Sequence, residues 1–187
     1  MLEPAPKLEN PRELLEQAKR GNAEAYGKLY EQYLTPVYRY VYSRVWQREL
    51  AEDLTQTVFL KVFQALERFE QREVEPLAYF FTVARNTVLD YWKKKRDLPL
   101  DDGTFPEPVA LGSHPSEAVD QAIARGSIEQ ALQELTPEQQ EVVRLRFLAD
   151  QPTHQVAKVM GKSEAAVRQL QSRAIKTLRK HLNSETL

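Results

Sequence analysis

The sequence predicts an all-α protein of two small helical bundle domains joined by a flexible acidic linker. Along most of the 187 residues, apolar side chains recur at three- and four-residue spacing, which is the period of an amphipathic helix. Hardly any segment alternates apolar and polar residues as strands do. Between residues 98 and 116 the helical period stops, and four prolines and two glycines interrupt the chain. We therefore expect domains at 1–96 and 121–187, with the linker at 97–120.

Four helices are predicted in the first domain. The first begins at Pro11 and ends at Gly21. The second passes through Pro36, where a bend is expected, and the third and fourth cover about 51–66 and 76–96. Their apolar faces should form the core of the domain. These faces contain Leu14, Leu15, Ala18, Tyr26, Leu29, Tyr30, Tyr33, Val37, Tyr38, Val41, Leu54, Val58, Phe59, Val62, Phe63, Leu66, Leu77, Phe80, Phe81, Ala84, Val88 and either Tyr91 or Trp92.

The second domain ends in a predicted helix-turn-helix. A helix at 123–135 is followed by Thr136 as N-cap and Pro137 as first residue of the next helix. A helix at 153–160 stops at Gly161, and Ser163 caps a long last helix that reaches about residue 182. In such a unit the first helix braces the second, whose exposed face enters the major groove of DNA.

The outer face of the last helix has the chemistry needed to read base edges. Arginine pairs two donors with guanine, glutamine pairs with adenine, and glutamate accepts a hydrogen bond from cytosine. The alternative is a solvated polar face on a helical bundle, and this helix alone does not separate the two. The candidate residues for duplex binding are Glu164, Arg168, Gln169, Ser172, Arg173 and Lys176.

A helix of the first domain, at 79–93, mixes aromatic with basic residues. This mixture suits single-stranded DNA, because bases stack on aromatic rings while cations follow the backbone. Most of these aromatic residues are expected in the core, which is the alternative role for the whole stripe. The candidates for strand binding are Tyr79, Arg85, Asn86 and Lys93.

The charge distribution favours nucleic acid although the net charge is only −1. Residues 97–120 hold six acidic residues and no lysine or arginine, whereas residues 152–181 hold seven bases and one acid. A basic run, Lys93–Arg96, directly precedes the acidic strip. Two basic surfaces are thus separated by an acidic segment.

Three segments resemble a known family, the group IV or extracytoplasmic-function (ECF) sigma factors of the sigma-70 family. Ala51–Phe63 resembles the family's polymerase-binding helix. Val83–Asn86, followed by Asp90, Tyr91 and the basic run, resembles the helix that engages the minus-ten promoter element. Leu135–Phe147 resembles the start of the domain that binds the minus-thirty-five element. The likeness spans almost the whole chain, with the segments in the family's order.

The resemblance implies an alternative sigma factor, which binds core RNA polymerase, directs it to specific promoters and assists promoter melting. Asp53, Gln56 and Leu60 would face the clamp coiled coil of the polymerase large subunit, and the polymerase flap is a further expected contact. Asp53 has a simpler alternative role, as an acid stabilised by the helix dipole. Promoter DNA is the second implied partner, and Asn86 and Lys93 would contact its minus-ten element.

The family also makes an anti-sigma factor a candidate partner, and it implies that the acidic linker threads toward the polymerase active-site cleft. A plain tether is the alternative for the linker. The sequence departs from the family at Tyr79, where tryptophan is common, and at Gln155, where glutamate is common. It also departs at Glu164–Arg168, so promoter preference does not transfer from relatives.

Other classes of function fit less well. A helix-turn-helix repressor or activator is the runner-up, and it would bind duplex DNA without polymerase. An enzyme comes third, because the three histidines are scattered and no nucleophile, metal or cofactor pattern is found. No apolar run approaches the roughly 20 residues that cross a bilayer, and the N-terminus lacks a signal-peptide pattern. We therefore expect no membrane insertion, no cofactor and a cytoplasmic protein.

Overall fold

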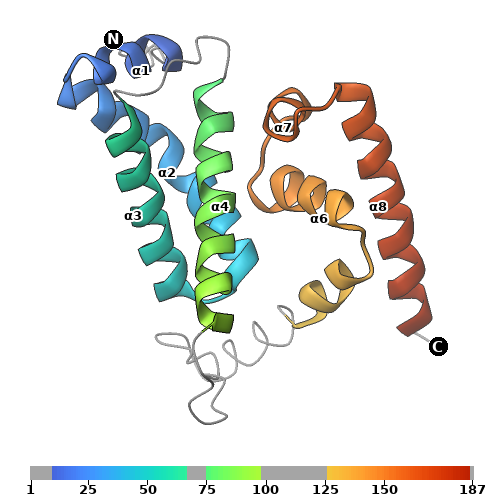
Figure 1. Cartoon of the computed structure of the whole chain (residues 1–187). Helices are drawn as coiled ribbons and strands as arrows, with labels where there is room; N and C mark the ends of the chain where they lie inside the picture. The colour runs from blue at the N-terminus through green and yellow to red at the C-terminus, as the bar shows by residue number, and fades with distance from the viewer. Residues whose placement is uncertain (1–9, 67–74, 98–125, 186–187) are drawn as a thin grey trace, which may run out of the picture.

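The computed structural model describes residues 10–66, 75–97 and 126–185, and the elements of these three ranges are all helical (Figure 1). The predicted all-α class is therefore confirmed. The predicted linker at 97–120 lies outside the described residues except for Asp97, which ends a helix.

The first domain is a bundle of α1 (Pro11–Lys19), α2 (Ala23–Val45), α3 (Arg48–Ala65) and α4 (Pro76–Asp97). Asn10 caps α1 by accepting a hydrogen bond from the Arg12 backbone N–H at 3.1 Å, and Asn22 caps α2 in the same way. Gly21 takes a left-handed φ of 86° between the two helices. The predicted stop is confirmed, because α1 ends at Lys19. The left-handed angle at Gly21 is one that glycine adopts without strain.

The core of the first domain follows the predicted apolar faces with two exceptions. Tyr30 and Phe63 were expected inside, but they are 36% and 51% exposed. Phe63 packs edgewise on the Tyr26 ring and Tyr30 packs at a tilt on the Phe59 ring, and both rings are open to solvent beyond these contacts. The apolar stripe of α2 and α3 is therefore wider than the core that covers it. At the end of α4 it is Tyr91 that packs against the core, while Trp92 is exposed.

The second domain consists of a helical segment at 126–133, α6 (Pro137–Val143), η2 (Arg144–Leu148), α7 (Thr153–Met160) and α8 (Glu164–Glu185). Thr136 forms a capping box with Gln139 at the start of α6. The five-residue η2 continues α6 as a π-helix. The predicted helix-turn-helix is present as α7, a turn at Gly161, and α8.

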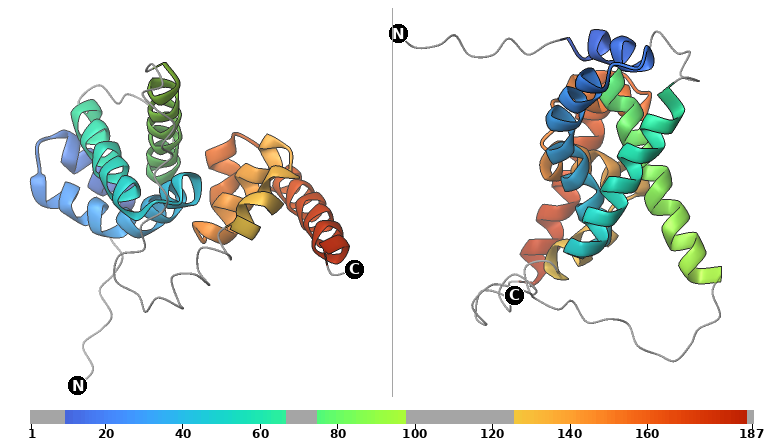
Figure 2. Two further views of the ribbon diagram at one scale, coloured as in Figure 1. Left: turned by 90° about the horizontal axis from the view of Figure 1, so that it is seen from below. Right: turned by 90° about the vertical axis from the view of Figure 1, so that its left-hand side faces the viewer.

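The two domains pack against each other (Figures 1 and 2). Helix α4 contacts α7, and α2 contacts η2. One hydrophobic cluster continues across the junction, from Phe81, Ala84 and Val88 of α4 to Val156 and Ala157 of α7. Helix α8 lies on the far side of the second domain from the first, which leaves its outer face free (Figure 2).

Candidate nucleic-acid interface

The outer face of α8 presents all six residues predicted to bind duplex DNA. Each of Glu164, Arg168, Gln169, Ser172, Arg173 and Lys176 is exposed. Glu164 pairs with Arg168 at 2.9 Å, one turn along the helix. Farther along the helix, basic and polar side chains line a shallow hollow of about 420 Å³. The face is thus a basic and polar surface of a size and chemistry that a DNA groove or phosphate row can contact.

The position of α8 is fixed by the turn that precedes it. Gly161 has a φ of 62°, and the backbone N–H of Lys162 donates to the Ala157 carbonyl at 2.9 Å. Ser163 then caps α8 by accepting from the Ala166 N–H at 3.2 Å. Val156 and Val167 are fully buried where α7 and α8 meet. Local backbone geometry and packing together set the angle at which α8 is presented.

The strand-binding candidates on α4 fall into separate environments. Arg85 and Asn86 are exposed and line a cleft of about 440 Å³ between the two domains. Lys93 is exposed about two turns farther along the helix. Tyr79 is half-buried against the core, and this burial raises the pKa of its hydroxyl. The structure therefore brings Arg85 and Asn86 together and leaves the other two candidates apart from them.

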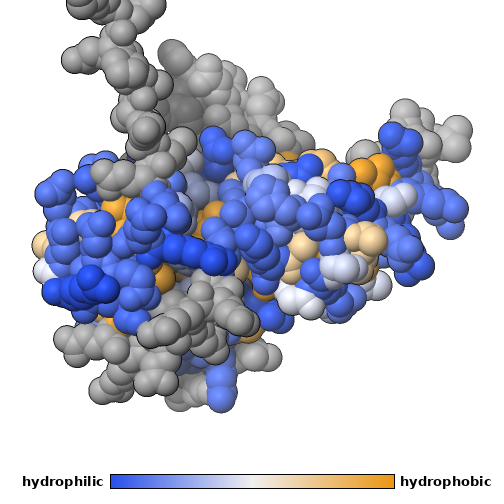
Figure 3. All heavy atoms as spheres, turned by 90° about the horizontal axis from the view of Figure 1, so that it is seen from above, coloured by the Kyte–Doolittle hydropathy of each residue, from blue (hydrophilic) through white to orange (hydrophobic). Residues whose placement is uncertain are grey.

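The polymerase-binding candidates share one face of α3. Asp53, Gln56 and Leu60 are all exposed, and their spacing places them along one side of the helix. Leu60 is 55% exposed, and Phe63 stands one turn beyond it. Exposed apolar residues next to polar ones are typical of a protein interface. Figure 3 shows another face of the molecule, mostly hydrophilic with small scattered hydrophobic patches.

Sequence reasoning missed a group of residues at the junction of the domains. The hydroxyl of Tyr40, a fully buried residue, donates to the Glu141 carboxylate at 2.7 Å, and Arg44 pairs with the same carboxylate. Arg144 donates to the backbone carbonyl of Ser43. Burial and the neighbouring Arg44 charge lower the pKa of Arg144 to about 10, so it stays charged at neutral pH. No local pattern could reveal these contacts, because the partners lie about a hundred residues apart in the sequence.

A second missed group surrounds Glu75, just before α4. Its carboxylate pairs with Lys158 of α7 at 3.0 Å and with Arg12 of α1 at 3.4 Å. Gln155 of α7 adds a hydrogen bond to it. Burial opposes ionisation of Glu75, but these partners outweigh it and lower the pKa. Phe147, on η2, is a third missed feature, as an aromatic side chain that is 51% exposed.

Two other kinds of site are not found in the part of the chain that the structure describes. No group of three or more histidine and acidic side chains there could hold a metal ion. Nor is any helix within 10–66, 75–97 and 126–185 both long and apolar enough to cross a bilayer.

Comparison with known proteins connects both domains to one family of transcription proteins. The Sigma-70 region 2 family matches residues 29–97, and the Sigma-70 region 4 family matches residues 131–180. The ECF RNA polymerase sigma factor BldN of Streptomyces coelicolor is 38% identical over 167 residues, which are 89% of this chain and 63% of that protein. The chain thus spans just under two thirds of that relative. SigX of Bacillus subtilis, also an ECF sigma factor, is 29% identical over 85% of this chain and 84% of its own length.

Solved structures show the same fold. CnrH, in complex with the cytosolic domain of CnrY, superposes with a TM-score of 0.69 at 20% identity, over 94% of this chain and 99% of that one. The sigma factor RpoE of Bartonella quintana, in complex with the anti-sigma factor NepR, gives a TM-score of 0.61 at 23% identity, over 86% and 98%.

Proposed function

Because this chain belongs to the extracytoplasmic-function sigma factors of the sigma-70 family, we propose that it binds core RNA polymerase, directs it to specific promoters and assists promoter melting. The observation that carries the proposal is the order of the family matches, with region 2 on the first helical domain and region 4 on the helix-turn-helix domain. RNA synthesis itself would be catalysed by the polymerase, so the chain is proposed to be no enzyme. It is proposed to act in the cytoplasm together with the polymerase.

The proposed division of labour follows the three exposed faces. The α3 face with Asp53, Gln56 and Leu60 binds the polymerase clamp. The α4 residues Arg85 and Asn86 contact the melted minus-ten strand, and Tyr79 and Lys93 extend this contact at either side. The α8 face reads the duplex of the minus-thirty-five element. On this proposal the functional domains are 1–96 and 121–187, with 97–120 connecting them.

Two further protein contacts are proposed. The exposed Phe147 gives the second domain an apolar contact for the polymerase flap. An anti-sigma factor is a proposed regulator, because solved relatives of the same fold carry such a partner or a cytosolic protein domain in their complexes.

The competing function is a repressor that binds duplex DNA by itself. The α8 face would serve either protein, so it does not separate them. The two functions differ in the role they give the α3 face, which binds polymerase only in a sigma factor. Polymerase dependence of DNA binding is therefore the property to measure.

The deciding experiment mixes the purified chain with bacterial core RNA polymerase and genomic DNA fragments, and maps transcript starts against core enzyme alone. Discrete new starts that share two upstream sequence elements are expected. A chain that fails to associate with polymerase, and binds duplex DNA tightly alone, would overturn the proposal in favour of the repressor.

A further inference from the structure

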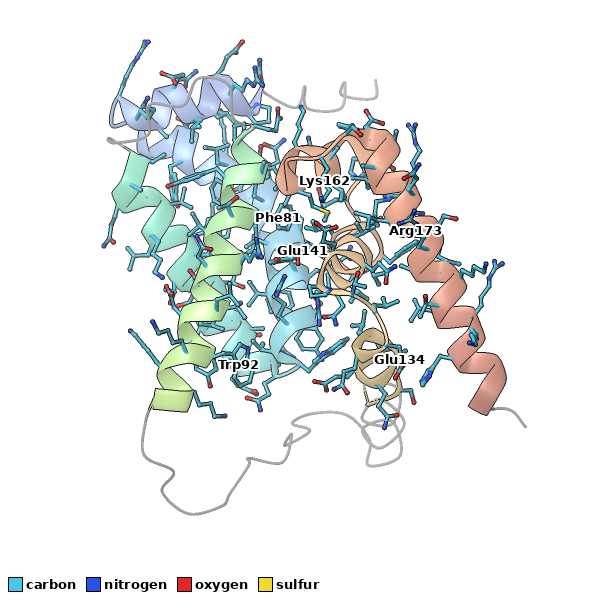
Figure 4. The ribbon with its side chains drawn as sticks, turned by 45° about the vertical axis from the view of Figure 1, so that its right-hand side comes forward. Phe81, Trp92, Glu134, Glu141, Lys162 and Arg173 are labelled. Carbon is cyan, nitrogen blue, oxygen red and sulfur yellow. The ribbon has the colours of Figure 1, made fainter. Side chains whose placement is uncertain are left out.

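The cleft between the domains is lined by charged and polar residues of both domains. Arg85 and Asn86 of α4 form one wall, and Glu138 and Glu141 of α6 belong to the other. Figure 4 shows Phe81 on the α4 side and Glu141 and Lys162 on the facing side. The cleft holds about 440 Å³. The surface that the proposed function assigns to a DNA strand therefore faces the second domain of the same chain.

Polar contacts connect the domains at two separate points. At the first, Glu141 accepts hydrogen bonds from Tyr40 and Arg44, and its side chain is only 15% exposed. At the second, Lys158 of α7 reaches the Glu75 carboxylate at 3.0 Å; the Glu75 side chain is 15% exposed and that of Lys158 is 47% exposed. The Arg44–Glu141 pair, with both side chains largely buried, is expected to contribute more than a surface ion pair does.

Apolar packing supports the same docking. Trp46, which follows α2 with a left-handed φ of 54°, packs against a cluster of the second domain that includes Leu132, Val143 and Ala174. A tryptophan in this backbone conformation is strained, and such strain persists where surrounding contacts hold it. With the shared cluster between α4 and α7, the junction has the apolar centre and polar edge of a specific interface.

We propose that the second domain docks on the first as an intramolecular lid, so that the free chain adopts a closed state in which a DNA strand cannot reach Arg85 and Asn86. The effect of the lid rests on the proposed function, because the strand that it would exclude is the minus-ten strand. A strand entering the cleft would meet α6 and would have to displace it to lie along Arg85 and Asn86. The α8 face stays exposed in the closed state, so the lid would act on strand binding and spare the duplex-reading surface.

The chain contains no cysteine, so two dyes can be attached at introduced cysteines without background. Glu31→Cys on α2 and Lys180→Cys on α8 place them on exposed positions of different domains. Resonance energy transfer between the dyes then reports closure in the full chain. Glu141→Gln removes the charge that Arg44 and Tyr40 contact, and should lower the transfer efficiency. The charge swap Arg44→Glu with Glu141→Arg should restore it.

The matched control is Glu134→Gln, the same chemical change at an exposed glutamate outside the cleft (Figure 4). It should leave the transfer efficiency unchanged. The functional readout is binding of a fluorescent single-stranded DNA of mixed sequence to the free chain. Opening should tighten this binding at least about tenfold for Glu141→Gln and not for Glu134→Gln, because the apparent affinity scales with the open fraction.

Two results would overturn the lid. One is a low transfer efficiency in the unaltered chain that Glu141→Gln does not change. The other is an opened Glu141→Gln chain whose affinity for the single strand stays the same. Neither measurement uses polymerase, so a chain that fails to bind polymerase would refute the proposed function and leave the closure result standing.

Discussion

Arg173 stands on the outer face of α8 and is the residue whose loss should affect promoter choice most directly. Arg173→Glu places a negative charge where DNA is proposed to bind. We expect use of the cognate promoters to fall at least about tenfold, because one good base contact is worth about 1–3 kcal/mol. Polymerase affinity should not change. Transcription from mapped promoters and a polymerase pull-down measure the two effects.

The control for Arg173 is Arg20→Glu, an identical charge reversal at an exposed position after α1. It should leave promoter use as it is. If Arg173→Glu reduced polymerase binding as well, the proposed separation between the α8 face and the α3 face would be wrong.

Asp53 and Gln56 are expected to affect the binding of polymerase more strongly than the binding of DNA. Both are exposed on α3, so Asp53→Ala with Gln56→Ala should leave the melting temperature nearly unchanged. We expect polymerase binding to weaken by roughly 1–2 kcal/mol, as for interface residues of moderate importance. Titration of labelled polymerase gives the affinity, with the exposed Glu31→Ala on α2 as control. An unchanged affinity would contradict the proposed role of the α3 face in binding polymerase.

Side chains on helix faces were predictable from sequence to different degrees. The spacing placed six polar residues on the outside of α8, and their exposure is confirmed; their roles stay predictions. Tyr40 was not singled out, because its partner Glu141 is 101 positions away. Tyr30 and Phe63 were wrongly assigned to the core, because periodicity gives the apolar face and not how much of it a neighbour covers.

At the scale of elements, two glycines offer opposite tests of backbone conformation. Gly161 ends α7 with a φ of 62°, whereas Gly27 lies inside α2. A Cβ at either position meets no atom within 4 Å. Gly161→Ala should therefore lower the free energy of unfolding by about 1–2 kcal/mol through backbone strain alone. Gly27→Ala should raise it by about 0.5–1 kcal/mol through helix propensity. Urea unfolding midpoints measure both.

Gly27→Ala serves as the control for Gly161→Ala, because both add the same methyl group in open space. Equal effects of the two substitutions would contradict the view that the turn of the helix-turn-helix depends on the left-handed angle at Gly161. Lost promoter use by Gly161→Ala, with folding retained, would show that this angle also aims α8.

Most element boundaries could be predicted because caps and stops are local. Pro11, Thr136, Gly161 and Ser163 each act within a few residues. The start of α3 at Arg48 was missed by three residues, since Gln47 precedes it without a side-chain cap. The π-helical turn η2 was also missed, because its backbone N–H groups bond one residue farther back and no residue type marks this change.

At the scale of the whole molecule, docking of one domain on the other could not be predicted. The linker composition indicates two domains, but the contacts that join them connect residues far apart in the sequence. Gln155 shows the difficulty. It departs from the glutamate expected by resemblance, and in the structure it donates to Glu75. A glutamate there would set two carboxylates against each other, so this departure favours the closed state.

The closed state should depend on pH through Glu75. Within 10–66, 75–97 and 126–185, the charged or titratable groups that face its carboxylate are Arg12 of α1, Tyr33 of α2 and Lys158 of α7. The pKa of Glu75 is lowered from 4.5 when the domains are docked. The contribution of ionised Glu75 to the stability of the closed state is therefore fully present above pH 4.5 and is lost as the pH falls through the lowered pKa. Dye transfer efficiency should be flat from about pH 6 to 8 and fall in acid.

Glu75→Gln separates this effect from general acid unfolding, since the amide resembles the protonated acid at every pH. The variant should be more open than the unaltered chain at neutral pH, and the two should converge in acid. Circular dichroism, recorded alongside, shows whether the helices remain folded where transfer is lost. If Glu75→Gln matched the unaltered chain at neutral pH, the contact with Lys158 would contribute nothing to closure, and the Glu141 cluster with the apolar centre would have to hold the domains together.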